Sequence, residues 1–135
     1  MPRKHMGLGT PGDWLNRARS NLIRARQPKM EGVFWEDLCF DAQQATEKAL
    51  KAVLIDRGIQ FRLVHDIAEL LTYLEKNGLS LPEEICAAAA LTNFAVEARY
   101  PGTAEPVTSE EFKEVLQTAE AVVTWAEALV KNKKV

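Results

Sequence analysis

One stretch of the chain, residues Phe34–Arg57, constrains the fold more than any other. It runs for 24 residues without glycine or proline. Its apolar residues recur at intervals of three and four, which places them on one face of an α-helix. They are Leu38, Ala42, Ala45, Ala49 and Val53, with Leu50 and Leu54 widening the face. The alanines would let other helices approach closely, and Gly58 is placed to end the helix in a left-handed conformation. We therefore predict that this helix is the spine of a bundle.

Two neighbouring segments also have helical spacing. The first is expected to begin with Asp13 as its N-cap and to end before Pro28. The other begins after Asp66, with Glu69 completing an acidic capping box, and ends at the Asn-Gly pair 77–78. The apolar stripe of this second segment is Ile67, Leu70, Leu71 and Leu74.

A fourth helix is predicted to open at Ser80 or Leu81, with Pro82 near its first position. Its body, Ile85–Ala98, is apolar almost all round, so we expect it to be deeply buried. Pro101 stops it.

The last helix has the strongest local signal in the chain. Thr108 and Glu111 have the spacing of a capping box, and Val107 and Phe112 that of a hydrophobic staple. The helical period then continues to Val130, and lysines follow it, as is favourable at a helix C-terminus.

No strand pattern competes with these five helices. We predict a single-domain, all-α, up-and-down bundle, for which 135 residues are enough to bury a core. The expected boundaries are a flexible basic tail at 1–12, the helical domain at 13–131, and a C-terminal tail at 132–135.

The net charge of -2 hides an uneven distribution. Residues 1–30 contain seven Lys or Arg and one acid, and residues 31–135 contain ten against eighteen, so the two parts carry +6 and -8. The basic part could bind phosphate or an acidic partner, or it could be a solvated helix face beside a tail.

The two cysteines, Cys39 and Cys86, lack metal-binding spacing, so we interpret them as reduced, packed thiols and predict no metal site. The apolar run Ile85–Val96 has 12 residues, whereas a membrane span needs about 20. The first residues lack the apolar region of a secretory signal. We expect a cytoplasmic protein that does not enter the membrane.

Four polar residues on the spine helix share one face next to the apolar stripe: Gln44, Glu47, Lys48 and Lys51. One interpretation is a solvated face with a weak Glu47–Lys51 pair. The other is the wall of a polar cleft, in which the lysines meet phosphate and the glutamine meets a base or ribose.

Three further residues could complete such a cleft. His65 lies just before a helix N-terminus, where the dipole favours neutral imidazole, and a capping or packing role is its alternative. Arg99 and Tyr100 could anchor a phosphate and stack on a base, or Arg99 could pair with an acid while Tyr100 closes the core.

Several enzyme classes lack their motifs. The chain has no Glu-x-x-His for a di-iron bundle, no Gly-rich phosphate loop and no nucleophile elbow.

Three stretches together resemble the HEPN (higher eukaryote and prokaryote nucleotide-binding) domain family. They are the run QQATEKALK at 43–51, the helix start His65-Asp66-Ile67, and the break Ala98-Arg99-Tyr100-Pro101. The resemblance covers residues 13–131. It implies a helical bundle similar to the C-terminal domain of kanamycin nucleotidyltransferase, commonly a homodimer. It also implies a minimal nucleotidyltransferase as partner, in a two-component system of toxin–antitoxin type.

Some members of this family are metal-independent ribonucleases that use an Arg followed after four to six residues by a His. This chain departs from that motif, because the positions at which the His would follow Arg99 are occupied by Ala104, Glu105 and Pro106. We therefore expect a protein that binds a nucleotide or RNA, without a cofactor. The alternatives are a ribonuclease with a displaced site built from His65 and Arg99, and a module that only binds proteins through its basic first helix.

Overall fold

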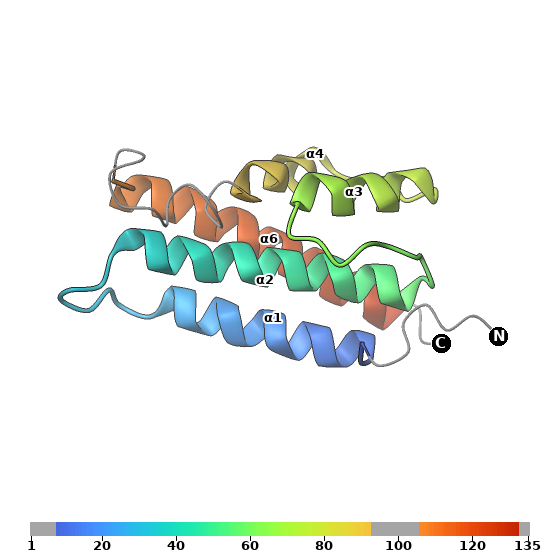
Figure 1. The fold of residues 1–135 in the computed structure, drawn as a ribbon, viewed down its shortest axis with the longest axis horizontal. Helices are drawn as coiled ribbons and strands as arrows, with labels where there is room; N and C mark the ends of the chain where they lie inside the picture. The colour runs from blue at the N-terminus through green and yellow to red at the C-terminus, as the bar shows by residue number, and fades with distance from the viewer. Residues whose placement is uncertain (1–7, 93–105, 133–135) are drawn as a thin grey trace.

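The computed structural model of the chain describes residues 8–92 and 106–132 (Figure 1). The helices within them are α1 (Pro11–Arg26), α2 (Trp35–Asp56), α3 (Ile67–Lys76), α4 (Glu83–Cys86) and α6 (Ser109–Asn132), and a 3-10 helix, η1 (Ala87–Thr92), follows α4 directly. These two ranges contain no β-strand. The predicted all-α bundle is confirmed.

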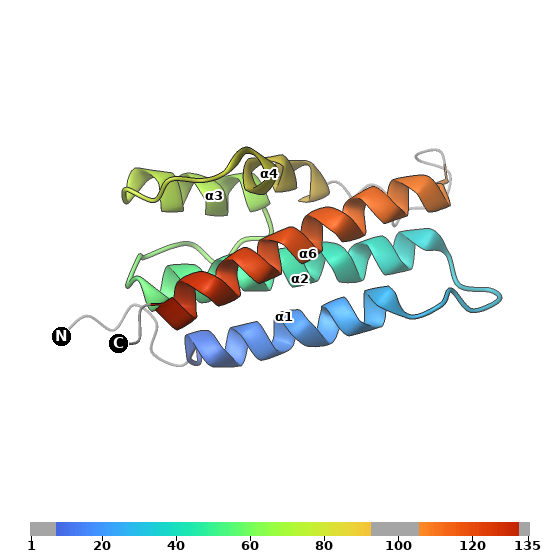
Figure 2. The ribbon, with the colours of Figure 1, turned by 180° about the vertical axis from the view of Figure 1, so that it is seen from behind.

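The three long helices α1, α2 and α6 lie side by side, and the shorter α3 and α4 form a second layer along one side of them (Figures 1 and 2). α2 packs against α1, α6, α3 and η1. α1 runs in the opposite direction to α2, whereas α6 runs in the same direction (Figure 1). α2 is therefore the central helix of the fold, as its sequence predicts.

The apolar stripe of α2 is buried throughout. Leu38, Ala42, Ala45, Ala49 and Val53 are all part of the core, and the three alanines have no exposed surface. A methyl side chain at these positions lets the neighbouring helices approach closely. Gly58 has a φ of +69°, so it ends α2 in the left-handed conformation that favours glycine.

α1 begins three residues earlier than its sequence suggests. Its N-cap is Thr10, whose hydroxyl accepts a hydrogen bond from the backbone N–H of Asp13, and Asp13 Oδ2 accepts one from the Thr10 N–H. Asp13 was expected to be the cap and is instead the N3 member of a capping box. Pro11 occupies the first turn, where its missing N–H costs nothing, so the helix absorbs residues expected to belong to the tail.

The cap of α3 is confirmed in part. The carboxylate of Asp66 accepts hydrogen bonds from the N–H groups of Ala68 and Glu69, as predicted. The Glu69 side chain does not turn back to complete a capping box. It accepts hydrogen bonds from the guanidinium of Arg62 at 2.7 and 2.8 Å and from the Tyr73 hydroxyl at 2.6 Å. Charge-assisted bonds of this kind are stronger than the bond to a single backbone amide that they replace.

The capping box of α6 forms as predicted. The Thr108 hydroxyl accepts from the Glu111 N–H at 3.1 Å, and the Glu111 carboxylate accepts from the Thr108 N–H at 2.9 Å. The Trp35 and Phe112 rings lie 5.0 Å apart, centre to centre, which joins the first turns of α2 and α6.

The fourth helix begins near Pro82, close to its predicted start, but the prediction of a deeply buried α-helical body was wrong within the described residues. Only four residues of α4 are α-helical before the chain tightens into η1, and only Ile85, Ala88 and Leu91 are buried there. Residues three apart are aligned in a 3-10 helix, so one stripe faces the core and the remaining side chains face outward. Cys86 is accordingly exposed and not packed, whereas Cys39 is fully buried as expected. Residues 93–98 of the predicted helix lie outside the described ranges.

The connection between α2 and α3 turns back along α2, so that α3 runs in the same direction as α2 (Figure 1). At the far end of this connection, His65 contacts Glu47, which lies near the middle of α2.

Candidate functional site

Two charged residues of α2 are buried inside the bundle. The Glu47 and Lys51 side chains are 3% and 6% exposed, and Lys51 Nζ donates a hydrogen bond of 2.8 Å to Glu47 Oε2. The predicted Glu47–Lys51 pair therefore forms. It does not lie on a solvated face, where such a pair would be weak, but inside the bundle. Removing two charges from water is costly, so each needs further polar partners.

Glu47 collects those partners from three directions. In addition to Lys51, Gln43 Nε2 donates to Oε1 at 3.0 Å, and His65 Nδ1 lies 2.9 and 3.0 Å from the two carboxylate oxygens. A carboxylate only accepts, so Nδ1 carries the proton. The His65 side chain is 74% exposed, and its Nε2 makes no hydrogen bond within the described residues. One edge of the imidazole is thus fixed and the other faces solvent.

Gln44 joins the same network through a neighbour that was not a candidate from the sequence. Its Nε2 donates to Gln43 Oε1 at 2.9 Å, and Gln43 in turn donates to Glu47. Gln43 is fully buried. A signal was available, because a glutamine four residues before Glu47 lies one helical turn away from it.

Lys48 lies in a second branch of polar contacts. Its Nζ donates to Asn21 Oδ1 at 2.7 Å, Asn21 Nδ2 donates to Asp41 Oδ1 at 3.2 Å, and Arg24 lies 3.5 Å from Asp41. Burial lowers the pKa of Lys48. The positive charges of Arg17 and Lys51 lower that pKa too, while Glu47 and Asp41 raise it. Lys48 is thus a partly desolvated cation in contact with a neutral amide.

Trp14 adds an aromatic side to the site, although its sequence position indicated only a place in the apolar stripe of the first helix. Lys51 Nζ lies 5.7 Å from the centre of its ring, in cation–π geometry. The Trp14 indole N–H donates to the Leu8 carbonyl at 2.6 Å.

The structure thus brings together Glu47, Lys51 and His65 by direct contact, and places Gln44 and Lys48 next to them. Arg99 and Tyr100 lie outside the described residues, so their part in the cleft stays a prediction.

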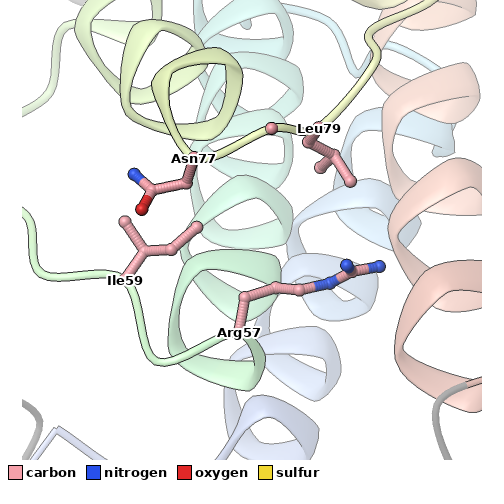
Figure 3. Close-up of a pocket in the computed structure, with 5 residues that line it drawn as sticks. Arg57, Ile59, Asn77 and Leu79 are labelled. Carbon is pink, nitrogen blue, oxygen red and sulfur yellow. The ribbon is translucent and has the colours of Figure 1, made fainter.

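Another hollow lies away from these residues (Figure 3). Arg57 and Ile59, just after α2, face Asn77 and Leu79, just after α3, around a volume of about 170 Å³. None of the predicted site residues lines it.

Within residues 8–92 and 106–132, no group of three or more His, Cys, Asp or Glu side chains could hold a metal ion. In the same ranges, no helix is long and apolar enough to cross a membrane.

The HEPN domain model matches residues 12–129, which is most of the chain. The chain therefore belongs to the HEPN family.

Two solved structures are similar over nearly their whole length. One is ST0689, an archaeal HEPN homologue, with a TM-score of 0.74 and 29% identity, covering 90% of this chain and 98% of the other. The second is TT1696 from Thermus thermophilus, with a TM-score of 0.73 and 32% identity, covering 87% of this chain and 96% of the other. A comparison with curated proteins found no match.

Chemically, the site offers two kinds of group to a ligand. Lys48 is a cation that could meet phosphate, and His65 presents an unprotonated ring nitrogen when the imidazole is neutral. Glu47 and Lys51 are too deeply buried to be the main ligands and serve to hold the groups around them.

Proposed function

We propose that this HEPN-domain protein binds a nucleotide or RNA at the α2 face formed by Gln44, Glu47, Lys48, Lys51 and His65. The observation that carries the proposal is the burial of Glu47 with Lys51 and His65 around it. A buried charged network is a costly way to stabilise a helix compared with apolar packing. A role in positioning Lys48 and His65 for a ligand would explain why the chain keeps such a network.

Arg99 and Tyr100 belong to the same proposal. They would supply a phosphate anchor and a stacking surface, as their position in the Arg-Tyr-Pro break suggests.

Binding is tested by calorimetric titration of the protein with ATP, GTP and a short RNA. We expect Lys48→Ala and His65→Ala to weaken binding, because the first removes a partly buried cation and the second removes an exposed imidazole from the site. Lys113→Ala is the control, since Lys113 is an exposed lysine near the start of α6. Wild-type protein that binds none of the three ligands would overturn the proposal.

We further propose that the protein acts in the cytoplasm as a homodimer, together with a minimal nucleotidyltransferase, in a two-component system of toxin–antitoxin type. Membership of the HEPN family supports this. The test is to co-express the chain with the short nucleotidyltransferase expected in an adjacent reading frame. Co-elution of the two proteins is expected, as is a dimer of this chain alone in light scattering.

A metal-independent ribonuclease is the second candidate, and the Glu47–His65 contact favours it. A carboxylate that holds Nδ1 leaves Nε2 able to accept a proton, which is the task of a general base. The assay is RNA cleavage in the presence of a chelator. Activity lost in His65→Ala supports this candidate, and intact RNA at high protein concentration rejects it.

The third interpretation, docking of a partner on the basic first helix, has weaker support. Two arginines of α1, Arg19 and Arg26, pair with Glu127 and Glu120 of α6. Much of the charge of this helix is therefore neutralised within the bundle.

A further inference from the structure

A pocket opens between the first turns of α1 and the middle of α2, beside the site described above. It has a volume of about 260 Å³, and its lining residues are Leu8, Asp13, Trp14, Arg17 and Lys48. A shallower hollow of about 580 Å³ shares Leu8, Asp13 and Arg17 with it and adds Gly9, Asn16 and Ser20. Of all these residues, only Lys48 was a candidate from the sequence.

Arg17 is distinct among the arginines of α1. The other three each pair with a carboxylate: Arg19 with Glu127, Arg24 with Asp41 and Arg26 with Glu120. Arg17 is exposed and makes no ion pair or hydrogen bond within the described residues. Its guanidinium is thus available at the pocket, where its planar set of donors matches the oxygens of a phosphate.

Lys48 supplies a second cation to the same pocket. Its Nζ is hydrogen-bonded to the neutral amide oxygen of Asn21, which leaves further N–H donors on the ammonium group. Partial burial lowers the pKa of Lys48 and the charge of Arg17 lowers it further, whereas the carboxylates of Glu47 and Asp41 raise it. An anion placed between the two cations would offset the repulsion between them.

The single carboxylate of the pocket does not cancel these charges. Asp13 Oδ2 is engaged by the N–H of Thr10 in the capping box. One carboxylate against two cations leaves the pocket with an excess of one positive charge. The free acceptor positions of Asp13, together with Asn16 and Ser20, suit the hydroxyl groups of a sugar.

Trp14 gives the pocket a fixed aromatic wall. Its indole is held by the hydrogen bond to the Leu8 carbonyl and by the ammonium of Lys51 over the ring. A side chain fixed in this way loses little entropy when a planar group packs against it.

We propose that this pocket binds the phosphate group of a nucleotide, with Arg17 and Lys48 as the phosphate ligands and Trp14 against the base or sugar. The inference rests on the proposed function, which it deepens by extending the ligand site from α2 onto α1.

The test is calorimetry at fixed ionic strength with AMP, adenosine and inorganic phosphate as probes. For wild-type protein we expect AMP to bind more tightly than adenosine. Arg17→Ala should weaken AMP binding about 10- to 100-fold, as the loss of charged hydrogen bonds predicts, and leave adenosine nearly unchanged. Arg17→Lys should lie between, because it keeps the charge but loses the planar fork. Arg26→Ala, on the same helix but outside the pocket and outside the polar contacts of Lys48, is the matched control.

A second pair of probes separates a free nucleotide from an RNA end. Two short RNAs of one sequence, with a 5′-phosphate or a 5′-hydroxyl, are titrated against the same variants. A preference for the 5′-phosphate that disappears in Arg17→Ala supports the pocket and identifies its ligand as an RNA end.

The outcomes distinguish this inference from the proposed function. If nucleotides or RNA bind equally to wild type and Arg17→Ala, the pocket assignment is overturned and the proposed function stands. If inorganic phosphate binds in an Arg17-dependent manner and no nucleotide or RNA binds, the proposed function fails and only an anion pocket is left. Absence of binding by all probes overturns both.

Discussion

His65 Nδ1 lies 2.9 Å from the Glu47 carboxylate, although 18 positions of sequence separate the two residues. The contact joins an exposed ring on a connecting segment to a charge buried in the central helix. It therefore sets both the orientation and the protonated nitrogen of the imidazole.

The first prediction concerns the tautomer of His65. At alkaline pH, where imidazoles are neutral, nitrogen NMR should show the proton on Nδ1, because Glu47 can only accept. The signals that disappear in His65→Gln are those of His65. The double variant Glu47→Leu/Lys51→Met removes the acceptor without leaving a buried lysine unpaired. In that variant the preference for the proton on Nδ1 should disappear. The same tautomer in both proteins would contradict the contact.

The second prediction concerns the buried pair. Lys51→Met should destabilise the fold by about 3 kcal/mol, since it leaves Glu47 as a buried charge that has lost its lysine partner. Adding Glu47→Leu should recover much of the lost stability, because apolar pairs often replace buried ion pairs at little cost. Denaturant unfolding measures both. A loss below about 1 kcal/mol for the single variant would indicate a pair exposed to solvent.

The third prediction separates the two cysteines. Burial raises the pKa of the Cys39 thiol to about 12, with the charges of Glu36 and Glu111 adding to the shift. At pH 8, only about one Cys39 in 10,000 is then a thiolate, which is the reactive form. A thiol reagent should modify Cys86 quickly and Cys39 only after unfolding.

Cys86→Ser should accordingly abolish the fast reaction of the folded protein. If the two thiols react at equal rates in the folded protein, the burial of Cys39 is contradicted.

The fourth prediction is a dependence on pH. Hydrogen bonds from Arg62 and Tyr73 lower the pKa of Glu69 from 4.5 to about 2. A carboxylate with a lowered folded pKa stabilises the native state above its unfolded pKa, and this contribution is lost as the pH falls toward the folded value. Between pH 4.5 and 2, wild type should lose stability faster than Glu69→Gln, as followed by denaturation midpoints. If the stability of the two proteins depends on pH in the same way, the hydrogen bonds from Arg62 and Tyr73 to Glu69 are contradicted.

The fifth prediction concerns the start of α6. Thr108→Ala should cost about 1 kcal/mol, because it removes the hydroxyl that caps the helix. Thr124→Ala in the exposed middle of the same helix is the control and should be neutral or slightly stabilising, since alanine favours helix. Equal effects in thermal unfolding would rule out a capping role for Thr108.

The helices could largely be predicted from the sequence because the signals for them are local. The stripe of α2, the Asp66 cap and the Thr108–Glu111 box each depend on residues a few positions apart. The α4–η1 segment could not be predicted in the same way. Its residues Ile85–Leu91 are all apolar, so the pattern does not show which of them face the core.

The site could be predicted only in part. Periodicity placed Glu47 and Lys51 on one face, but what covers that face depends on α1 and on the path of the chain after α2. The contact of His65 with Glu47 needs that path to turn back, and no local signal in residues 57–66 fixes this direction. Arg17 was overlooked because its importance lies in what its neighbours do: the other arginines of α1 have partners.

The returning connection between Gly58 and His65 makes the site sensitive to chain length in a way that the bundle is not. Surface connections tolerate insertions at small cost in stability. One residue added between Gly58 and Arg62 would leave the helices packed and yet move the imidazole away from Glu47. Related chains with this bundle could therefore gain or lose the histidine contact through a change in loop length alone, with every residue of α2 unchanged.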